Sequence, residues 1–468
     1  MTSGRDAVEV GAITTMTGQE TMSRNPTSRN PTAPSGSDWT FPAVYSLGFL
    51  TLISAFNYLD RSLLGLALPQ IKAEMHLSDT VMGLVSGLAF VLFYSIMSVP
   101  IAWAADRWSR RNIIAAGFFF WSLMTLLTGW VANIWQLTIA RFLMGAGEAC
   151  AIAPSNSMTA DLFRVERRAL AYSIFAIASS ISSILFFPIA GWIGQNYGWR
   201  HMFIVAGIPG IILALLFLLT VREPRRGASE ASTGPSLARS GQNADRMPFW
   251  QSLRFLLGSR AYLALLAGAT LMGLNVFASS VWTPTFLTRV HNLSLGEIAA
   301  TIGPIRGICG VSGVLLGGIL VDRLGRRAPH WRMTIPAVAC ILVGPAEAVF
   351  ALSAVHSVWL GAFAVSGFLL FIHQGPVFAG VMAVADVRIR AVATSILLFC
   401  SAMFGQAVGP LFVGVMNDML EPSLGPLAIR YSMLIVAATA ALGGLSFLLA
   451  GRFIVADANR ATTSGAAA

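Results

Sequence analysis

The stretches DRWSRR, at residues 106–111, and DRLGRR, at residues 322–327, repeat one pattern of charges at two places in the chain. Each comes directly after the second long apolar run of its half, and a polar stretch from Val221 to Arg260 divides the halves. A second pair of stretches agrees, because ADLFRVERRA (160–169) and ADVRIRA (385–391) each end a fourth apolar run. The chain is therefore expected to consist of two parallel structural repeats.

The composition of the chain is that of an integral membrane protein. Of its 468 residues, 55% are hydrophobic and 11% are charged, which is too apolar for a soluble protein of several domains. Apolar runs recur at about the 20 residues that a membrane-spanning helix needs. We place them at residues 43–68, 81–104, 113–132, 135–159, 169–192, 201–221, 262–288, 298–321, 333–353, 357–384, 391–416 and 427–451. Because the runs are continuously apolar rather than alternating, they predict helices and not the strands of a closed barrel.

The predicted fold is an all-α integral membrane protein with twelve transmembrane helices in two pseudo-symmetric six-helix bundles. The bundles are predicted at residues 41–221 and 261–452, joined by a flexible polar linker at 222–260. Residues 1–40 are predicted to be a disordered tail, and residues 453–468 form a second tail. The first 38 residues contain no compact apolar core with a small-residue cleavage site, so no removable signal peptide is expected.

The distribution of the net charge of +10 predicts the topology. Arginine clusters follow the even-numbered apolar runs, at residues 107–111, 164–168, 222–226, 323–327 and 388–390. The opposite loops carry little more than Lys72, Arg200, Arg289 and Arg430. By the positive-inside rule, the clusters, the linker and both tails are cytoplasmic, in a multi-pass protein of the cell (inner) membrane. The positive charge thus reports topology, and no nucleic-acid partner is expected.

Several classes of chemistry lack the residues that they need. Lys72 is the single lysine and falls in a predicted outer loop, which excludes a Walker A phosphate loop and a pyridoxal phosphate Schiff base. The four cysteines fall inside predicted spans without the close pairing of a metal clamp, and we interpret them as packing residues. We therefore expect no cofactor, no metal site and no ATP-driven pump. An intramembrane enzyme is not expected either, because no Ser/His pair or catalytic acid pair appears.

Two motifs resemble those of the major facilitator superfamily. GGILVDRLGRR, at residues 317–327, is similar to the signature of that superfamily between helices 8 and 9, and RFLMGAGE, at 141–148, is similar to its helix-4 motif. The first-half copy of the signature departs from the pattern at Ala102 and Ser109, where glycines are expected. The resemblance covers residues 41–451 and implies the twelve-helix fold of a secondary transporter that works by alternating access.

Within the superfamily, the chain resembles the spinster family of lysolipid and sphingolipid transporters, as a bacterial member. That family also lacks the second glycine of the first-half signature. The similar stretches are NYLDR (57–61), FWSL (120–123), RFLMGAGEA (141–149), VREPRRG (221–227) and WTPTFLTR (282–289). The resemblance implies a lipid-like substrate and a transport cycle coupled to protons.

Four charged residues of the first half form the predicted proton-coupling region. Asp60 and Arg61 lie within an apolar run, where a charge costs roughly 2.5–3.5 kcal/mol and usually serves a function. Arg141 and Glu148 are seven residues apart, so they share one face of a helix. In the superfamily architecture the first and fourth helices line the central cavity, which predicts that the four side chains converge there with a net charge of zero.

An acid that loses its arginine partner on one side of the membrane can take up a proton there. We hypothesise that Asp60 is the main protonation site, that Glu148 shares or relays the proton, and that Arg141 is the partner exchanged between states. The resemblance supports these roles, because the matching positions are the proton-coupling residues of the family. The alternative is a fixed ion pair that orients the two helices, and Arg61 could instead bind a substrate anion.

The second half carries fewer charges and is expected to supply an apolar wall of the substrate cavity. With Arg61, the candidate cavity residues are Asn275, Trp282, Arg306, His373, Gln374 and Gln406. Arg306 is a candidate for a phosphate or carboxylate head group, or else it pairs internally or extends to the outer interface. His373 could titrate near neutral pH, although a lone histidine in a span is more often a packing residue. Glu347 is assigned no role.

The two repeated charge motifs predict a cytoplasmic gate. Carboxylates beside the inner helix ends can cap a neighbouring helix, and the arginines can reach acids that end the fourth run of each half. The predicted gate residues are Asp106, Arg107, Arg110, Arg111, Asp161, Arg168, Asp322, Arg323, Arg326, Arg327 and Asp386. Closed, the gate would latch the cytoplasmic side while the cavity opens outward. The alternative is that the arginines are topology signals only.

The whole sequence predicts a proton-coupled secondary transporter that moves a lysophospholipid or similar single-chain amphiphile. Its expected partners are an anionic amphiphile, protons and the lipid bilayer, and it is expected to act as a monomer. The main alternative is an organic-anion/proton symporter in which Arg61 holds the carboxylate of a sugar acid or a related substrate. A transport-dead sensor is a third class, less expected because no soluble signalling domain follows the last span.

Overall fold

The structure is a computed structural model that describes residues 39–226, 248–328 and 330–466. All but the last two residues of the predicted N-terminal tail, and residues 227–247 of the polar linker, therefore lie outside the described residues. Every regular element among the described residues is a helix, which confirms the all-α fold expected from the continuous apolar runs.

The first half of the chain folds into the six predicted spans. Its elements are α1 (Phe41–Met75), α2 (Asp79–Ser86), α3 (Leu88–Ala105), α4 (Arg110–Thr128), α5 (Ile134–Glu148), α6 (Ile152–Leu162), α7 (Val165–Ala176), α8 (Ala178–Ile181), the π-helical η1 (Ser182–Phe186), α9 (Phe187–Tyr197) and α10 (Trp199–Thr220). Three spans are interrupted, since α2 continues into α3 at Gly87, α5 into α6, and α7 through α8 and η1 into α9. Membrane helices tolerate such breaks where neighbouring helices cover the freed backbone groups.

The second half contains six more spans and one short additional helix. Its elements are α12 (Phe249–Leu257), α13 (Arg260–His291), α14 (Leu295–Arg327), α15 (Trp331–Leu352), α16 (His356–Phe371), α17 (Gln374–Val384), η2 (Val387–Ile389), α18 (Arg390–Leu424), η3 (Gly425–Leu427) and α19 (Ala428–Ala466). In the described residues, eleven stretches are long and apolar enough to cross a membrane, and the last, Arg390–Ala461, contains α18 and most of α19. The chain is therefore a multi-pass membrane protein with the predicted number of spans.

The prediction that Lys72 lies in a loop is wrong, because α1 continues seven residues beyond the predicted end of its span at Leu68. In this extension Gln70 donates a hydrogen bond to the Gly194 carbonyl at 3.1 Å, and Lys72 pairs with Asp79 at 2.6 Å. The helix ends only at His76, which adopts a left-handed conformation with φ of 51°. Lys72 therefore lies in the last helical turn.

The two charge motifs differ in backbone structure. DRLGRR is the last part of α14, whereas DRWSRR lies between α3 and the start of α4. Ser109 explains the difference, because its side chain accepts a hydrogen bond from the Asn112 amide and so starts a new helix at Arg110. The matching position in the second copy is Gly325, which packs closely against Arg332 and provides no such cap.

Parts of the predicted linker and C-terminal tail are helical. The helix α12 lies within the linker range, and α19 runs through the tail range as far as Ala466. On α19, the Asp457 carboxylate accepts hydrogen bonds from the Ser259 hydroxyl at 2.7 Å and the Ala261 amide at 2.8 Å. This contact caps α13 and so fixes the extended end of α19 to the second half.

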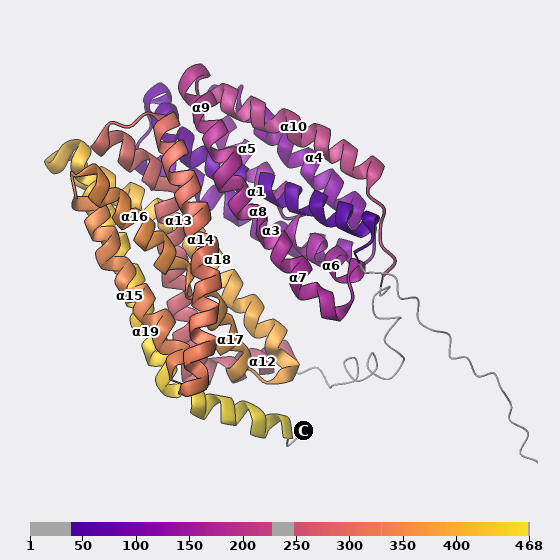
Figure 1. The fold of residues 1–468 in the computed structure, drawn as a ribbon. Coiled ribbons are helices and arrows are strands. Elements are labelled where there is room, and N and C mark those ends of the chain that lie inside the picture. The colour runs from indigo at the N-terminus through magenta and orange to yellow at the C-terminus, as the bar shows by residue number, and fades with distance from the viewer. Residues whose placement is uncertain (1–38, 227–247, 329, 467–468) are drawn as a thin grey trace, which may run out of the picture. The chain divides into compact units, whose positions relative to one another are not determined.

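Within Asp38–Ala468 the helices form two groups, which we call the N-bundle (α1–α10) and the C-bundle (α13–α19). Figure 1 shows them as indigo-to-magenta and salmon-to-yellow ribbons. The bundles meet where α1 packs on α13, α2 on α18 and α9 on α14. A hydrophobic cluster continues across this contact and includes Leu63 from the N-bundle and Trp282 and Ile298 from the C-bundle.

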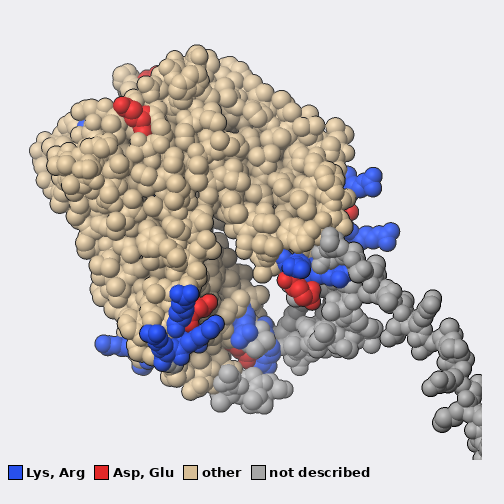
Figure 2. Space-filling model, in the orientation of Figure 1, with Lys and Arg blue, Asp and Glu red and all other residues tan. Residues whose placement is uncertain are grey.

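The two ends of the bundles differ in charge. The connections α3–α4, α6–α7 and α14–α15 carry the arginine clusters, and we call their side the basic end. The connections α1–α2, α13–α14 and α18–α19 lie at the opposite end. Figure 2 shows Lys and Arg side chains gathered at the basic end of both bundles, with the surface notched between them there.

Candidate functional site

The four charged residues predicted in the first half are brought together by α1 and α5. The Arg61 Nε atom lies 2.8 Å from Glu148 Oε2, and the Asn57 amide donates to the same oxygen at 2.9 Å. Asp60, Arg141 and Glu148 are all at most 1% exposed, whereas the Arg61 side chain is 21% exposed. Spacing predicted the shared helix face of Arg141 and Glu148, whereas the approach of α1 to α5 was expected from the family resemblance, and the structure joins the two helices at the Arg61–Glu148 pair. Its role in proton coupling stays a prediction.

Asp60 and Arg141 have incomplete polar partners within this cluster. Among the described residues, Asp60 Oδ1 and Arg141 Nε have no hydrogen-bond partner, and neither side chain is in an ion pair. The guanidinium groups of Arg61 and Arg141 lie over the Phe90 ring, 5.0 and 5.2 Å from its centre. A buried charge without a partner is costly, so this arrangement favours any change that pairs or neutralises Asp60.

A second buried polar group lies in the C-bundle, and sequence reasoning missed its acid. The Asn275 amide of α13 donates to Glu347 Oε2 of α15 at 2.7 Å, and the charge of Glu347 acts on Arg306 of α14. The signal was present, because an ionisable residue within a predicted span is a functional candidate by default. Glu347 was assigned no role because it lies near the end of its predicted span.

The remaining predicted cavity residues occupy separate surroundings. Trp282 is fully buried and donates to the Pro410 carbonyl at 2.9 Å, which fixes α13 against α18. His373 precedes α17 with its Nδ1 atom 2.6 Å from the Leu370 carbonyl oxygen, as expected of a packing residue. Gln374 is exposed, while Gln406 is buried where α18 meets the N-bundle. The structure does not bring these residues to Arg61 as one set of contacts.

An ion-pair network at the opposite end was not among the predicted sites. Asp79, at the start of α2, is fully buried between Lys72 Nζ at 2.6 Å and two nitrogens of Arg289 at 2.6 and 2.7 Å. The Asn417 amide donates to the same carboxylate at 2.8 Å. In return, Asp418 accepts hydrogen bonds from the backbone amides of residues 79 and 80, at 2.9 and 2.8 Å. We call these five residues the Asp79 network.

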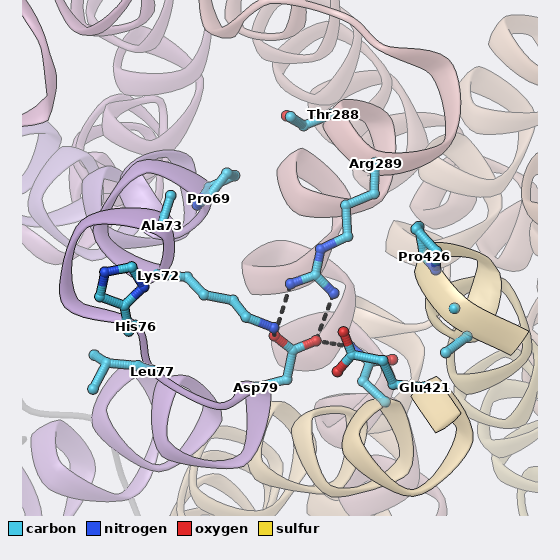
Figure 3. A pocket seen from close by; sticks show the side chains of 13 residues that line it. Pro69, Lys72, Ala73, His76, Leu77, Asp79, Thr288, Arg289, Glu421 and Pro426 are labelled. Atoms are coloured by element: carbon cyan, nitrogen blue, oxygen red, sulfur yellow. Dashed lines mark hydrogen bonds and ion pairs between the residues drawn. The ribbon is translucent and has the colours of Figure 1, made fainter. Parts of the chain in front are cut away.

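The Asp79 network connects the two bundles. Lys72 and Asp79 belong to the N-bundle, whereas Arg289, Asn417 and Asp418 belong to the C-bundle. Figure 3 shows Lys72 and Arg289 reaching the Asp79 carboxylate from opposite sides of a cavity of about 490 Å³. Each bundle thus supplies one carboxylate to the other, which joins the bundles at the opposite end.

The predicted gate residues of the N-bundle form a network at the basic end. Arg110 is 3% exposed and lies 2.6 Å from Asp161 and 2.9 Å from Glu223. Glu223, which was not predicted, also accepts from the Ser109 hydroxyl at 2.9 Å and the Arg111 amide at 2.7 Å. Burial raises the pKa of Glu223, but these hydrogen bonds outweigh it and hold the pKa below its ordinary value.

The other predicted gate residues lie within their own bundles. Arg226 donates to the Asp106 carbonyl, and Arg168 donates to the carbonyls of Ala160 and Phe163 at 3.0 and 3.2 Å. In the C-bundle, Arg388 lies 2.9 Å from Asp386. The side chains at the end of α14 are exposed, namely those of Asp322, Arg323, Arg326 and Arg327. That these residues latch the basic end in another state stays a prediction.

Comparison with known proteins supports the family resemblance. A family model described as Major Facilitator Superfamily matches residues 50–410. An "MFS-type efflux pump" of Mycolicibacterium smegmatis is 30% identical over 406 residues, which are 86% of this chain and 92% of that protein. "Protein spinster homolog 1" of Homo sapiens is 28% identical over 88% of this chain and 81% of its own.

Two further similarities concern substrate and conformation. A "Probable galactarate/D-glucarate transporter" of Escherichia coli is 30% identical over 59% of this chain and 65% of its own. A crystal structure of a bacterial homolog of the human lysosomal transporter spinster, described as inward-facing and unoccupied, matches with a TM-score of 0.78 and 26% identity, covering 89% of this chain and 98% of that one. The chain therefore belongs to the Major Facilitator Superfamily and is a spinster-like, multi-pass membrane transporter.

Proposed function

We propose that this transporter couples the movement of lysophospholipids or similar single-chain amphiphiles to protons. The observation that carries the coupling is the cluster between α1 and α5, in which Glu148 holds Arg61 while Asp60 is buried beside them without an ion pair in the described residues. The substrate class rests on the likeness to spinster proteins. A C-bundle with few charges in its spans supports it, because such a wall suits an acyl chain.

The arginine clusters support an orientation with the basic end in the cytoplasm of an inner-membrane protein. In that orientation the Asp79 network closes the outer end, and the notch between the bundles opens inward. The likeness to a relative described as inward-facing supports the same reading. Transport then requires the network to open as the basic end closes.

The proposed coupling step is an exchange of partners around Arg141. Its charge acts on both Glu148 and Asp60, yet in the described residues it is paired with neither. A shift of α1 against α5 that brings Arg141 onto Asp60 would expel a proton from Asp60. The reverse shift would let Asp60 take up a proton again.

The test is uptake of a labelled lysophospholipid into proteoliposomes, with and without an imposed pH gradient. We expect uptake by the wild type to respond to the gradient and uptake by Asp60→Asn to lose that response while substrate binding is retained. Glu166→Gln, which neutralises an exposed acid on α7, serves as the control and should behave as the wild type. An unchanged gradient response in Asp60→Asn would refute the role of Asp60.

A second candidate function is proton-coupled uptake of a sugar acid. It is favoured by the likeness to a galactarate/glucarate transporter and by Arg61, whose side chain is partly exposed and which has a guanidinium nitrogen without a hydrogen-bond partner in the described residues. The same proteoliposomes distinguish the two functions. Uptake of labelled galactarate, with no uptake of lysophospholipid, would assign the symporter function instead.

A further inference from the structure

The acid of the C-bundle, Glu347, has no place in the coupling cluster of the N-bundle. Glu347 is half-buried on α15, and one of its oxygens is held by Asn275, which is itself fully buried. Asn275 also donates to the Val436 carbonyl at 3.3 Å, so its amide nitrogen is fixed from two sides. Its Oδ1 atom is buried and has no hydrogen-bond partner in the described residues. The site is therefore polar and incompletely satisfied.

Arg306 completes this site from α14. It lies 11 residues after the first residue of the helix, Leu295, which is about 16 Å along the axis and close to the middle of a bilayer. In the part of the chain that the structure describes, its half-buried guanidinium makes no hydrogen bond or ion pair. An ionisable residue at this depth almost always faces the protein interior or a water-filled cavity and marks a functional site, so Arg306 is a candidate for binding an anion.

Glu347 and Arg306 are electrostatic partners without direct contact. Each charge acts on the other, and no ion pair joins them. Of the other charged or titratable groups near α15, Arg430 donates to the Leu352 carbonyl, five residues beyond Glu347 on the same helix, and His291 and His356 pack against Trp359. Arg306 acts on Glu347 across the contact between α14 and α15.

We infer that Glu347 is a second coupling acid, and that Arg306 binds the anionic group of the substrate. When a phosphate or carboxylate occupies Arg306, the positive charge that stabilises the Glu347 carboxylate is compensated. Glu347 then takes up one proton from solution, on the oxygen that Asn275 does not hold. Binding of the anion and uptake of the proton are therefore linked in the C-bundle, independently of Asp60. This inference rests on the proposed transport of an anionic substrate.

The experiment measures proton uptake on binding, by calorimetry in buffers of different ionisation enthalpy, with lysophosphatidylglycerol as the probe. We expect Asp60→Asn to retain uptake of up to one proton and Asp60→Asn/Glu347→Gln to take up none. In the Asp60→Asn background, the Kd should rise with pH by up to about tenfold per unit, and Glu347→Gln should remove that dependence. Arg306→Gln should weaken binding at least tenfold at every pH.

Two outcomes distinguish failure of the inference about Glu347 from failure of the proposed substrate. Probe binding to Asp60→Asn without proton uptake overturns the role of Glu347, and this variant leaves the C-bundle intact, so misfolding of the Glu347 variant cannot obscure the result. If the wild type binds galactarate and not the lysophospholipid, the proposed substrate is wrong. The inference is then tested with galactarate: uptake of one proton on binding to Asp60→Asn supports it, and binding without proton uptake overturns it.

Discussion

At the scale of single residues, Glu223 shows how one carboxylate can hold several chain segments together. It follows α10 and accepts hydrogen bonds from Ser109, Arg110 and the Arg111 amide at the start of α4. Because its pKa lies below the ordinary value, its contribution to stability is present at neutral pH. That contribution is lost as the pH falls through the lowered folded-state pKa.

Substitution of Glu223 by Gln should therefore have an effect that depends on pH. We expect Glu223→Gln to lower the free energy of unfolding by about 1.5–3 kcal/mol at neutral pH, the range for hydrogen bonds to a charged group. Melting curves of the purified protein from about pH 7 to pH 3 would show a shallower decline for the variant than for the wild type. Parallel declines would contradict this role, and Glu166→Gln, which removes an exposed acid, should follow the wild type.

Single residues also show which contacts can be predicted from the sequence and which cannot. Arg141 and Glu148 could be placed on one helix face from their spacing alone, because that relation is local. Asp79 could not be recognised, since its partners Arg289 and Asn417 lie 210 and 338 positions away in the chain. Glu223 could not be recognised for the same reason, because its partner Arg110 lies 113 positions earlier in the chain.

At the scale of elements, the contact between α2 and α18 depends on glycine. A Cβ atom at Gly83 would collide with the Pro410 carbonyl, and one at Gly87 would collide with the Gln406 carbonyl. These positions let two backbones approach closely across the two bundles. The sequence predicted the spans from their apolar lengths, but not this contact, because small residues occur throughout the chain and do not reveal which neighbour they face.

A larger residue at Gly83 should separate α2 from α18. We expect Gly83→Val to open the opposite end and to increase the distance between spin labels placed at Ser78 and Ser423, in a background without the four native cysteines. Gly361→Val is the matched control, because a Cβ atom there would meet no atom within 4 Å. A label distance in Gly83→Val equal to that in the control would show that the contact does not set the closure.

At the scale of the whole molecule, the repeated charge motifs predicted two bundles, and the fold agrees. They could not predict which end of the bundles is closed, since both access states use the same helices and the same residues. The structure shows which contacts join the bundles, and the Asp79 network is a highly charged one at the opposite end. The preferred state should therefore respond to the charge of Asp79.

Neutralising Asp79 should shift the molecule toward the state that is open at the opposite end. Asp79→Asn leaves Lys72 and Arg289 facing each other without their shared carboxylate, and removal of one partner from a buried pair costs about 3–5 kcal/mol. Because the two cations are 24% and 22% exposed, water recovers part of this cost. We expect a shift of about 2 kcal/mol, or roughly 30-fold, between the two states.

The same pair of spin labels, at Ser78 and Ser423, measures this shift as a new population at longer distance. The matched control is Glu74→Gln, which breaks an ion pair with Arg200 of similar length, 2.5 Å, but within the N-bundle. If both variants keep the wild-type distance distribution, the network is a product of closure and not its cause. If Asp79→Asn alone gains the longer distance, the charge of one residue sets the access state of the whole transporter.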